Sequence, residues 1–303
     1  MATGPVTVQE AMMIDPNSRP KAIWELRRST HRFLVRFAVA FWMSREDEPL
    51  VPPSLGHLHG HRRRKALARQ EARRLSRAAL YDFDPAATAL AVELGAMLRM
   101  GAHAQAVMIA GRANVVDSMG IEPPAPCGFL RWGTGVGYTI DGGAPIIACH
   151  WDKTAEGCWI VFWADNYVAA EVMRTRDSQP TFFIREYLKF TGPLLYDYPL
   201  LIRPALIHAR EPSQPTPPGP AEQHVTDSTV DSETAMVYTL LGAWKAMAMT
   251  GATTRTLHEP SRADAMVDRR AGVLPGTVTC VSAAEGAIQT LRDFLIAQGG
   301  ERW

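Results

Sequence analysis

The stretch that decides the fold runs from Cys127 to Ala164 and reads CGFLRWGTGVGYTIDGGAPIIACHWDKTAEGCWIVFWA. Within it, short apolar runs alternate with glycine-rich turns, which is typical of neighbouring β-strands. The runs are Phe129–Trp132, Ile146–Trp151 and Trp159–Ala164. The connection between the last two runs is short, polar and ends in Gly157, and these features predict an antiparallel hairpin.

Side chains alternate between the two faces of a strand, so the pattern also assigns neighbouring residues to opposite sides of the sheet. In the run from Ile146, His150 lies on one face, whereas Cys149 and Trp151 lie on the other. Neither face is polar throughout, so we expect both sides of the sheet to be covered. Because Cys149 and His150 point apart on a regular strand, they cannot form a nucleophile–base pair. We therefore expect Cys149 to be a buried core residue.

Outward from this sheet, the sequence predicts an α+β fold with a helical N-terminal region, a mostly antiparallel central sheet and a small C-terminal α/β segment. The clearest boundary is a Pro/Ser/Thr-rich stretch, which is typical of an extended linker. The expected segments are a flexible tail over 1–20, a basic helical region over 21–125, a β-rich core over 126–210, the linker over 211–233 and a C-terminal helical segment with one strand over 234–303.

Apolar residues at helical spacing predict the individual helices. One is the basic helix that follows Gly60, and another is a helical region that glycines at positions 95, 101 and 111 are expected to divide. The other expected elements follow from the same spacing and from capping residues. Together, the expected ranges are helices over Lys21–Ser44, Pro85–Met119, Ala235–Met249, Ser261–Arg270 and Ala283–Gln298, and a strand over Val278–Val281.

The helix after Gly60 carries the most distinctive charge pattern in the chain. Five of its basic residues are three or four positions apart, so they form a ridge along one helix face. We call these residues the basic ridge: Arg62, Lys65, Arg69, Arg73 and Arg77. Such a ridge can contact the phosphates of a nucleic acid. The alternative is a solvated helix face that the nearby acidic loop partly neutralises.

The charge of the chain is divided unevenly, although its formal total is only +1. Residues 1–77 hold fifteen Lys and Arg against seven Asp and Glu, a net charge of +8. The remaining residues hold seventeen against twenty-four, a net charge of −7. This asymmetry indicates either an anionic partner for the N-terminal part or electrostatic docking of the two parts on each other.

Two further patterns resemble ligand-binding motifs. His57, His59 and His61 alternate just before the basic ridge, but no Cys, Asp or Glu at ligand spacing completes a metal site, so we expect a polar loop without a metal. The run Gly133–Gly137 resembles a phosphate loop. However, a dinucleotide fingerprint opens a helix, whereas these glycines lie between strand-like runs and predict a strand connection. We therefore expect no cofactor.

The candidate catalytic residues are His150, Asp152 and Asp165, and Cys149 is a weaker candidate. A general acid or base must lie within hydrogen-bonding reach of a substrate proton. His150 stands at the end of a strand beside a glycine-rich turn and is the best placed of the four. A hydrolase built on these residues requires a pocket that joins His150 to a carboxylate.

Cysteine usage and hydropathy predict the setting of the protein. Four cysteines in 303 residues do not make a disulfide framework, and none form a CxxC pair. The N-terminus lacks a basic region followed by an apolar core, so we expect no secretory signal. The most apolar early run, Phe33–Met43, contains Arg36 and is too short to span a bilayer. These features predict a reduced, cytoplasmic protein without a membrane partner.

Several runs of the chain resemble a group of uncharacterised actinobacterial proteins, some of which are carried by phages and plasmids. The runs are PCGFLRW, GAPIIACHW and GCWIVFWAD in the sheet region, and LLGAWKAMA and SRADAMVDRRAG after the linker. The resemblance covers roughly residues 70–290. It implies a setting, a mobile genetic element or its host, and it assigns no activity or site residues.

Three functions are compatible with these patterns. The first is a non-enzymatic, DNA-associated or regulatory protein that contacts phosphates through the basic ridge. The second is a protein-interaction module whose partner docks on exposed tryptophans, with Trp132, Trp151 and Trp163 as candidates. The third is the hydrolase with a site near His150. We rank DNA ahead of a protein partner and the enzyme last, because the serine-protease, Walker, kinase and zinc-finger signatures are absent from the sequence.

Overall fold

The structure of the protein is a computed structural model. It describes residues 19–36, 56–109, 121–133, 135–136, 139–140, 144–153, 157–165, 183–189, 201–202, 235–287 and 289. Within these ranges, no helix combines the length and the apolar character that crossing a membrane requires.

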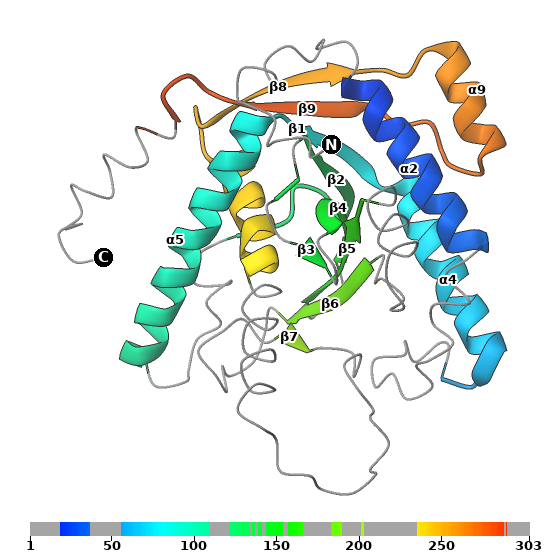
Figure 1. Ribbon diagram of the computed structural model, residues 1–303, viewed down its shortest axis with the longest axis horizontal. Helices are drawn as coiled ribbons and strands as arrows, with labels where there is room; N and C mark the ends of the chain where they lie inside the picture. Colours follow the sequence, from blue (N-terminus) through cyan, green and yellow to red (C-terminus); the bar gives the residue numbers. More distant parts are fainter. Residues whose placement is uncertain are drawn as a thin grey trace, which may run out of the picture.

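A mixed β-sheet of nine strands, counted over the described residues, forms the centre of the molecule (Figure 1). Eight strands follow the order β7-β6-β5-β4-β2-β1-β9-β8, and β3 pairs with β4 outside this path. The strands are β1 (Ala79–Phe83), β2 (Cys127–Trp132), β3 (Thr139–Ile140), β4 (Ala144–Lys153), β5 (Gly157–Ala164), β6 (Phe183–Lys189), β7 (Leu201–Ile202), β8 (Thr253–His258) and β9 (Val278–Ala283).

The three apolar runs that decide the fold form β2, β4 and β5, as the sequence predicts. β4 and β5 pair antiparallel on either side of the connection at 154–156, which confirms the hairpin. Along β4, His150 is paired with Val161 and Cys149 with Phe162, so the two neighbours lie on opposite faces of the sheet, as expected. The α+β class is confirmed, and most strand pairings are antiparallel.

The sequence pattern does not predict β1, which lies in a region for which only helices are expected. β1 pairs in parallel with both β2 and β9, so it occupies the middle of the sheet. Only one residue, Ala78, separates β1 from the basic helix, and no glycine or proline marks this boundary. Through β9, the C-terminal segment joins the same sheet as the central hairpin, although the two are far apart in the chain.

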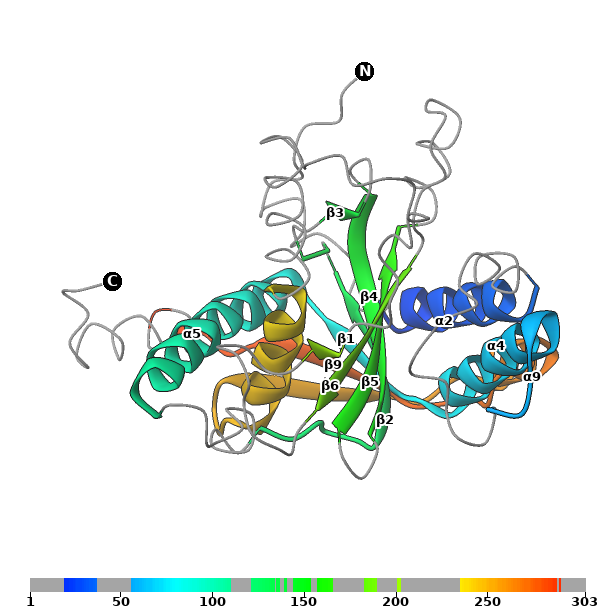
Figure 2. The same cartoon turned by 90° about the horizontal axis from the view of Figure 1, so that it is seen from below.

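Helices cover both faces of this sheet (Figure 2). On one face, α2 (Arg19–Arg36) packs against α4 (Gly60–Arg77). α9 (Arg262–Arg270) lies beside these two helices. On the other face lie α5 (Pro85–Ile109) and a helix over residues 235–248. The cover that is expected on both sides is therefore present, and it comes from elements on both sides of the central hairpin in the chain.

α5 continues without a break through Gly95 and Gly101, so the expected divisions at these two glycines are wrong. The absence of a side chain serves another purpose, because a Cβ on Gly95 would lie only 2.6 Å from the carbonyl oxygen of Tyr238. A Cβ on Gly242 would likewise collide with the backbone of Ala91 on α5. Glycine therefore allows α5 and the 235–248 helix to approach each other at backbone distance.

The C-terminal predictions are confirmed in part: Ala283, the predicted start of the last helix, instead ends β9, and residues 284–286 are not helical. The helix over 235–248 and β9 lie where the sequence places them, and α9 begins at the predicted cap. The hydroxyl oxygen of Ser261 accepts a hydrogen bond from the Asp264 amide at 3.1 Å. β8 is an additional strand that shows no alternation, because its four central residues are all exposed. The expected flexible tail over 1–20 is wrong at its end, because Arg19 and Pro20 belong to α2. The remaining predictions fall outside the described residues: the tail over 1–18, the first helix beyond residue 36, the second helical region beyond residue 109, the linker over 211–233 and most of the last helix.

Candidate functional site

The basic ridge lies on the outer face of α4. All five of its side chains are exposed, whereas Leu67, Ala68 and Leu75 on the opposite side of the helix are buried. Among the described residues, no carboxylate forms an ion pair with any member of the ridge. The acidic loop at 46–48, which is the expected source of neutralising charge, lies outside the described residues.

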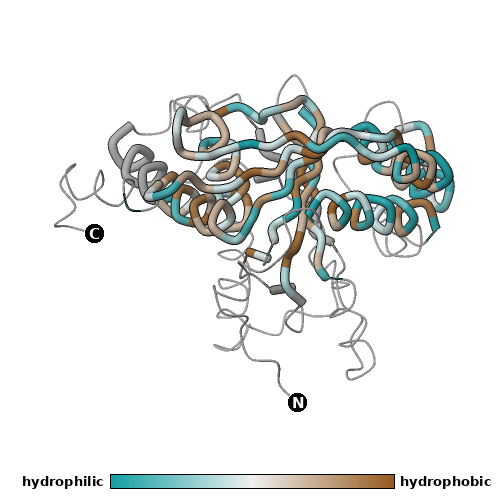
Figure 3. The backbone as a smooth tube through the Cα atoms, turned by 90° about the horizontal axis from the view of Figure 1, so that it is seen from above, coloured by the Kyte–Doolittle hydropathy of each residue, from teal (hydrophilic) through white to brown (hydrophobic). Residues whose placement is uncertain are grey.

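α2 and α9 extend this positive charge beyond α4. Together the three helices expose eleven Lys and Arg but only one carboxylate, that of Glu25. Figure 3 shows that the hydrophilic colours gather on this side of the molecule, while the hydrophobic colours follow the central strands. We call the eleven residues the cationic surface: Lys21, Arg32, Arg36, Arg62, Lys65, Arg69, Arg73, Arg77, Arg262, Arg269 and Arg270.

A buried ion-pair cluster fixes α9 against α2. Asp268 of α9 is fully buried and its two oxygens lie 2.7 Å from Nη2 of Arg27 and 2.8 Å from Nη1 of Arg28. Burial lowers the pKa of Arg27, and the carboxylate of Asp268 opposes this effect. Nearby, the indole N–H of Trp24 donates a hydrogen bond to the carbonyl of Gly276 at 2.9 Å. The position of α9 therefore depends on polar contacts with α2.

The chain after α9 also reaches the end of α4. The amide of Leu274 donates a hydrogen bond to the carbonyl of Ser76 at 3.1 Å. Arg269 and Arg270 precede Leu274 by a few residues, and Arg77 follows Ser76. Because each residue spans at most about 3.5 Å, the basic ends of α4 and α9 are close neighbours. Their proximity joins the arginines of α9 to the basic ridge as one surface.

A second buried network fixes α4 to the sheet. The imidazole Nε2 of His150 lies 3.1 Å from Oε2 of Glu71 on α4. Its Nδ1 accepts a hydrogen bond from the indole N–H of Trp163 at 3.0 Å. An indole nitrogen can only donate, so Nδ1 carries no proton in this arrangement and Nε2–H donates to Glu71. The two bonds therefore hold His150 as one neutral tautomer.

Glu71 extends the same network toward the surface. Its Oε1 accepts a hydrogen bond from Nη1 of Arg74 at 2.8 Å, and Nε of Arg74 lies 2.9 Å from a carboxylate oxygen of Asp152. Burial raises the pKa of Asp152, and Arg74 opposes this effect. The network runs from the sheet, through α4, to an arginine one residue after Arg73 of the ridge. It thus positions the ridge relative to the sheet.

These contacts do not provide the accessible pocket that a hydrolase requires around His150. The residue is only 1% exposed, and both ring nitrogens are engaged by Glu71 and Trp163. Asp152 reaches it only through Arg74 and Glu71. General acid–base chemistry needs contact with a substrate proton, and this geometry offers His150 none.

The other two catalytic candidates are also separated from His150. Asp165 follows the end of β5, where its amide donates to the carbonyl of Pro145 at 2.9 Å. Cys149 is fully buried on the other face of the sheet, and burial holds the pKa of its thiol well above the usual range. A protonated, enclosed thiol is a poor nucleophile. The structure therefore does not bring the predicted catalytic set together.

The tryptophans that the sequence offers as exposed docking residues are core residues instead. Trp132, Trp151 and Trp163 are each at most 3% exposed. Trp151 packs edge-on against Trp244 of the 235–248 helix, with ring centroids 5.5 Å apart. The interpretation of these tryptophans as interaction hot spots is wrong, because the helices that cover the sheet bury them.

The structure also describes the three alternating histidines and part of the glycine run that resemble ligand-binding motifs. His57, His59 and His61 are exposed, and over the described ranges no group of three or more His, Cys, Asp or Glu is arranged to hold a metal ion. In the loop after β2, the amides of Gly133 and Gly135 donate to backbone carbonyls at 2.9 and 3.3 Å. These two amides are occupied by the protein itself, as expected for a strand connection rather than a phosphate loop.

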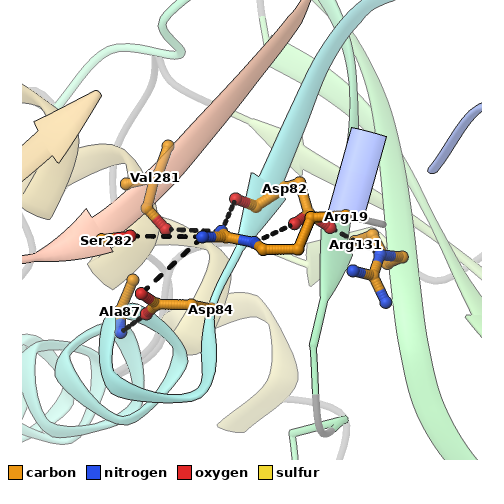
Figure 4. Close-up of polar contacts among 7 residues, drawn as sticks. All are labelled: Arg19, Asp82, Asp84, Ala87, Arg131, Val281 and Ser282. Atoms are coloured by element: carbon orange, nitrogen blue, oxygen red, sulfur yellow. Dashed lines mark hydrogen bonds and ion pairs between the residues drawn. The ribbon is translucent and has the colours of Figure 1, made fainter. Parts of the chain in front are cut away.

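One polar cluster has no counterpart in the sequence analysis, and Figure 4 shows it at the carboxyl end of β1. Asp82 is fully buried, and its carboxylate oxygens lie 2.8 Å from Nε of Arg19 and 2.5 Å from Nε of Arg131. Burial and the charge of Asp82 raise the pKa of Cys280, its neighbour on β9, to about 11. The only sequence signal was an Asp inside the apolar run of residues 79–83, and the two arginines are distant from it in the chain.

Comparisons of the chain with models of known protein families, with curated proteins and with solved structures found no match.

Proposed function

We propose that this protein binds double-stranded DNA through the cationic surface on α2, α4 and α9. The observation that carries the proposal is the imbalance of eleven exposed cations against one exposed carboxylate on these helices. Phosphate neutralisation by Lys and Arg releases counterions from DNA, and this release supplies most of the affinity of sequence-independent binding. The protein would act as a DNA-associated or regulatory component without catalysis of its own.

The basic ridge supports contact with a phosphate backbone through its spacing. From Arg62 to Arg77 the ridge covers fifteen residues of helix, which corresponds to about 22 Å at 1.5 Å per residue. A surface of this length can meet several successive phosphates of one duplex face. Because α4 is fixed to the sheet by Glu71 and His150, its cations are presented from a rigid support.

The absence of exposed aromatic residues on these helices favours duplex over single-stranded DNA. Proteins that bind single strands stack bases on Phe, Tyr or Trp side chains. On the fully described helices α2, α4 and α9, Trp24 is buried and Phe33 is half-buried, and no other Phe, Tyr or Trp occurs. Contacts with phosphates alone also predict little preference for sequence.

The proposal also implies where in the cell the protein acts. All four cysteines are free, which is consistent with a reducing compartment. A DNA partner places the protein in the cytoplasm of its host. Given the resemblance to actinobacterial and phage- or plasmid-borne proteins, the DNA of such a host or mobile element is the partner we expect.

Neutralising two ridge residues tests this proposal. In the Arg69→Gln/Arg73→Gln variant, we expect the slope of log Kobs against log salt to become about 2 less negative, because two phosphate contacts are lost. At about 0.1 M salt this corresponds to roughly fifty-fold weaker binding. The measurement is fluorescence anisotropy of a labelled duplex over a salt series, with circular dichroism to verify that the variant is folded.

The matched control removes the same charge from the other side of the sheet. Arg99 and Lys245 lie on α5 and the 235–248 helix, and neither belongs to the cationic surface. The Arg99→Gln/Lys245→Gln variant should keep the wild-type slope. Equal losses in the two variants would show that only net charge matters, and an unchanged Arg69→Gln/Arg73→Gln variant would refute the ridge as the contact.

A further inference from the structure

The Asp82 cluster stands where three parallel strands end. β1 pairs in parallel with β2 on one side and with β9 on the other, so their carboxyl ends meet at one edge of the sheet. In open α/β sheets, ligands bind in the crevice outside the carboxyl ends of the parallel strands, and β2, β1 and β9 form a parallel part of this mixed sheet. Arg131 and Ser282 come from the ends of β2 and β9, and Asp82 comes from β1 between them (Figure 4).

The two arginines of the cluster are used in different ways. Arg19 engages all three of its guanidinium nitrogens, with Asp82, Val281, Ser282 and, at 3.9 Å, Asp84. It serves as a structural clamp between α2 and the sheet. Arg131, by contrast, donates only its Nε–H, to Asp82. A guanidinium has five N–H groups, so four donors of Arg131 are without a partner among the described residues.

Asp82 fixes the orientation of the Arg131 guanidinium. The two residues are directly paired across β1 and β2, and Asp82 has no exposed surface. The Arg131 side chain is 18% exposed, so its two Nη atoms reach solvent while its Nε is held by Asp82. A fixed guanidinium presents two parallel N–H groups in the geometry that a carboxylate or phosphate accepts. Holding the group in advance also reduces the entropic cost of binding.

The polar groups beside Arg131 are already engaged in hydrogen bonds within the protein, so recognition of a carboxylate or phosphate depends on Arg131. Asp84 caps α5 by accepting a hydrogen bond from the Ala87 amide at 2.7 Å, so its carboxylate occupies the helix terminus. The amides of Gly133 and Gly135 are bonded to backbone carbonyls. Arg19 shares the buried carboxylate of Asp82 with Arg131 and also lies 3.9 Å from a carboxylate oxygen of Asp84, so the recognition rests on the unengaged N–H donors of Arg131 and not on an excess of positive charge.

We propose that Nη1 and Nη2 of Arg131 form a binding site for a small oxyanion, the carboxylate or phosphate group of a small molecule. The site is separate from the basic ridge and does not depend on DNA binding. One guanidinium without further donors predicts modest affinity, with a dissociation constant on the order of 1 mM. The two possible sources of the oxyanion share the same recognition chemistry and are separated by experiment.

Protection of Arg131 from phenylglyoxal, a reagent that modifies accessible guanidinium groups, tests the site on the wild-type protein. Modification is followed by peptide mass spectrometry in sodium phosphate, in sodium acetate and in sodium chloride at equal ionic strength. With about 10 mM of an oxyanion that binds at 1 mM, the modification rate of Arg131 should fall roughly tenfold relative to chloride. Protection by phosphate alone or by acetate alone identifies the class of ligand.

Two outcomes would overturn the site: equal modification of Arg131 in all three salts, or no modification of Arg131 in chloride. The Arg69→Gln/Arg73→Gln variant should retain the protection, which separates this site from the DNA surface. The Arg131→Lys variant keeps a cation against Asp82 but loses the paired donors. In that variant, calorimetric titration with phosphate should show at least tenfold weaker binding than in the wild type, and unchanged binding would contradict the assignment.

Discussion

Replacing Asp268 with alanine lowers the free energy of unfolding by about 3–5 kcal/mol, because it leaves the buried guanidinium of Arg27 without a counter-charge. Arg27 is 1% exposed and Asp268 is fully buried, so water cannot replace the lost partner. Burial already lowers the pKa of Arg27, and the change removes the charge that opposes this effect. Urea denaturation monitored by circular dichroism measures the loss.

The matched control is Asp264→Ala, which removes the other carboxylate of α9 from a half-exposed position in its first turn. There we expect a loss of no more than about 1 kcal/mol, the contribution of a charge at a helix terminus. A comparable cost in the two variants would contradict a stabilising role for the buried pair. Because Asp268 holds α9 against α2, its loss should also weaken DNA binding at temperatures where the variant remains folded.

Replacing Glu71 with alanine costs about 2–4 kcal/mol, because it removes the acceptor of the buried Nε2–H of His150 and one partner of Arg74. Both Glu71 and His150 are at most 2% exposed. Arg74 keeps its ion pair with Asp152, at 2.9 Å, which limits the loss. The same urea denaturation experiment gives the magnitude.

The Glu71→Gln variant separates the hydrogen bond from the charge. A glutamine oxygen can still accept from Nε2–H of His150, so we expect about half of the cost of the alanine variant. In the wild type, nitrogen-15 NMR should show His150 protonated on Nε2 and unprotonated on Nδ1. A proton on Nδ1 in place of Nε2 would be incompatible with the Trp163 contact and would remove the physical reason for the two Glu71 predictions.

The central hairpin could be predicted because its information is local. Alternating apolar runs and a glycine-ended turn define β4 and β5, and the same alternation correctly separates Cys149 from His150. β1 could not be predicted, because its five residues lie between two helices without a turn signal that separates it from the basic helix. Its parallel pairing with β2 and β9 nevertheless places it in the middle of the sheet. Its partner strands lie far along the chain, and parallel pairing leaves no mark in the neighbouring sequence.

The cationic surface was predictable only in part, because it also depends on contacts between residues that are far apart in the chain. The spacing of Arg62 through Arg77 gives a ridge on one helix face, and its exposure follows from the apolar residues opposite. Nothing in the sequence places Arg269 and Arg270 beside it, because that contact depends on the buried Asp268 pair. The burial of Trp151 was equally hidden, since its partner Trp244 lies beyond the linker.

The salt dependence of duplex binding by the wild-type protein tests DNA recognition most directly. Anisotropy of a labelled duplex is measured at increasing salt, and log Kobs is plotted against log salt concentration. Five phosphate contacts from the basic ridge predict a slope of about −4 to −5, and contacts from α9 would make it more negative. Absence of binding at the lowest salt, or a slope near zero, would contradict a cationic surface that binds DNA phosphates.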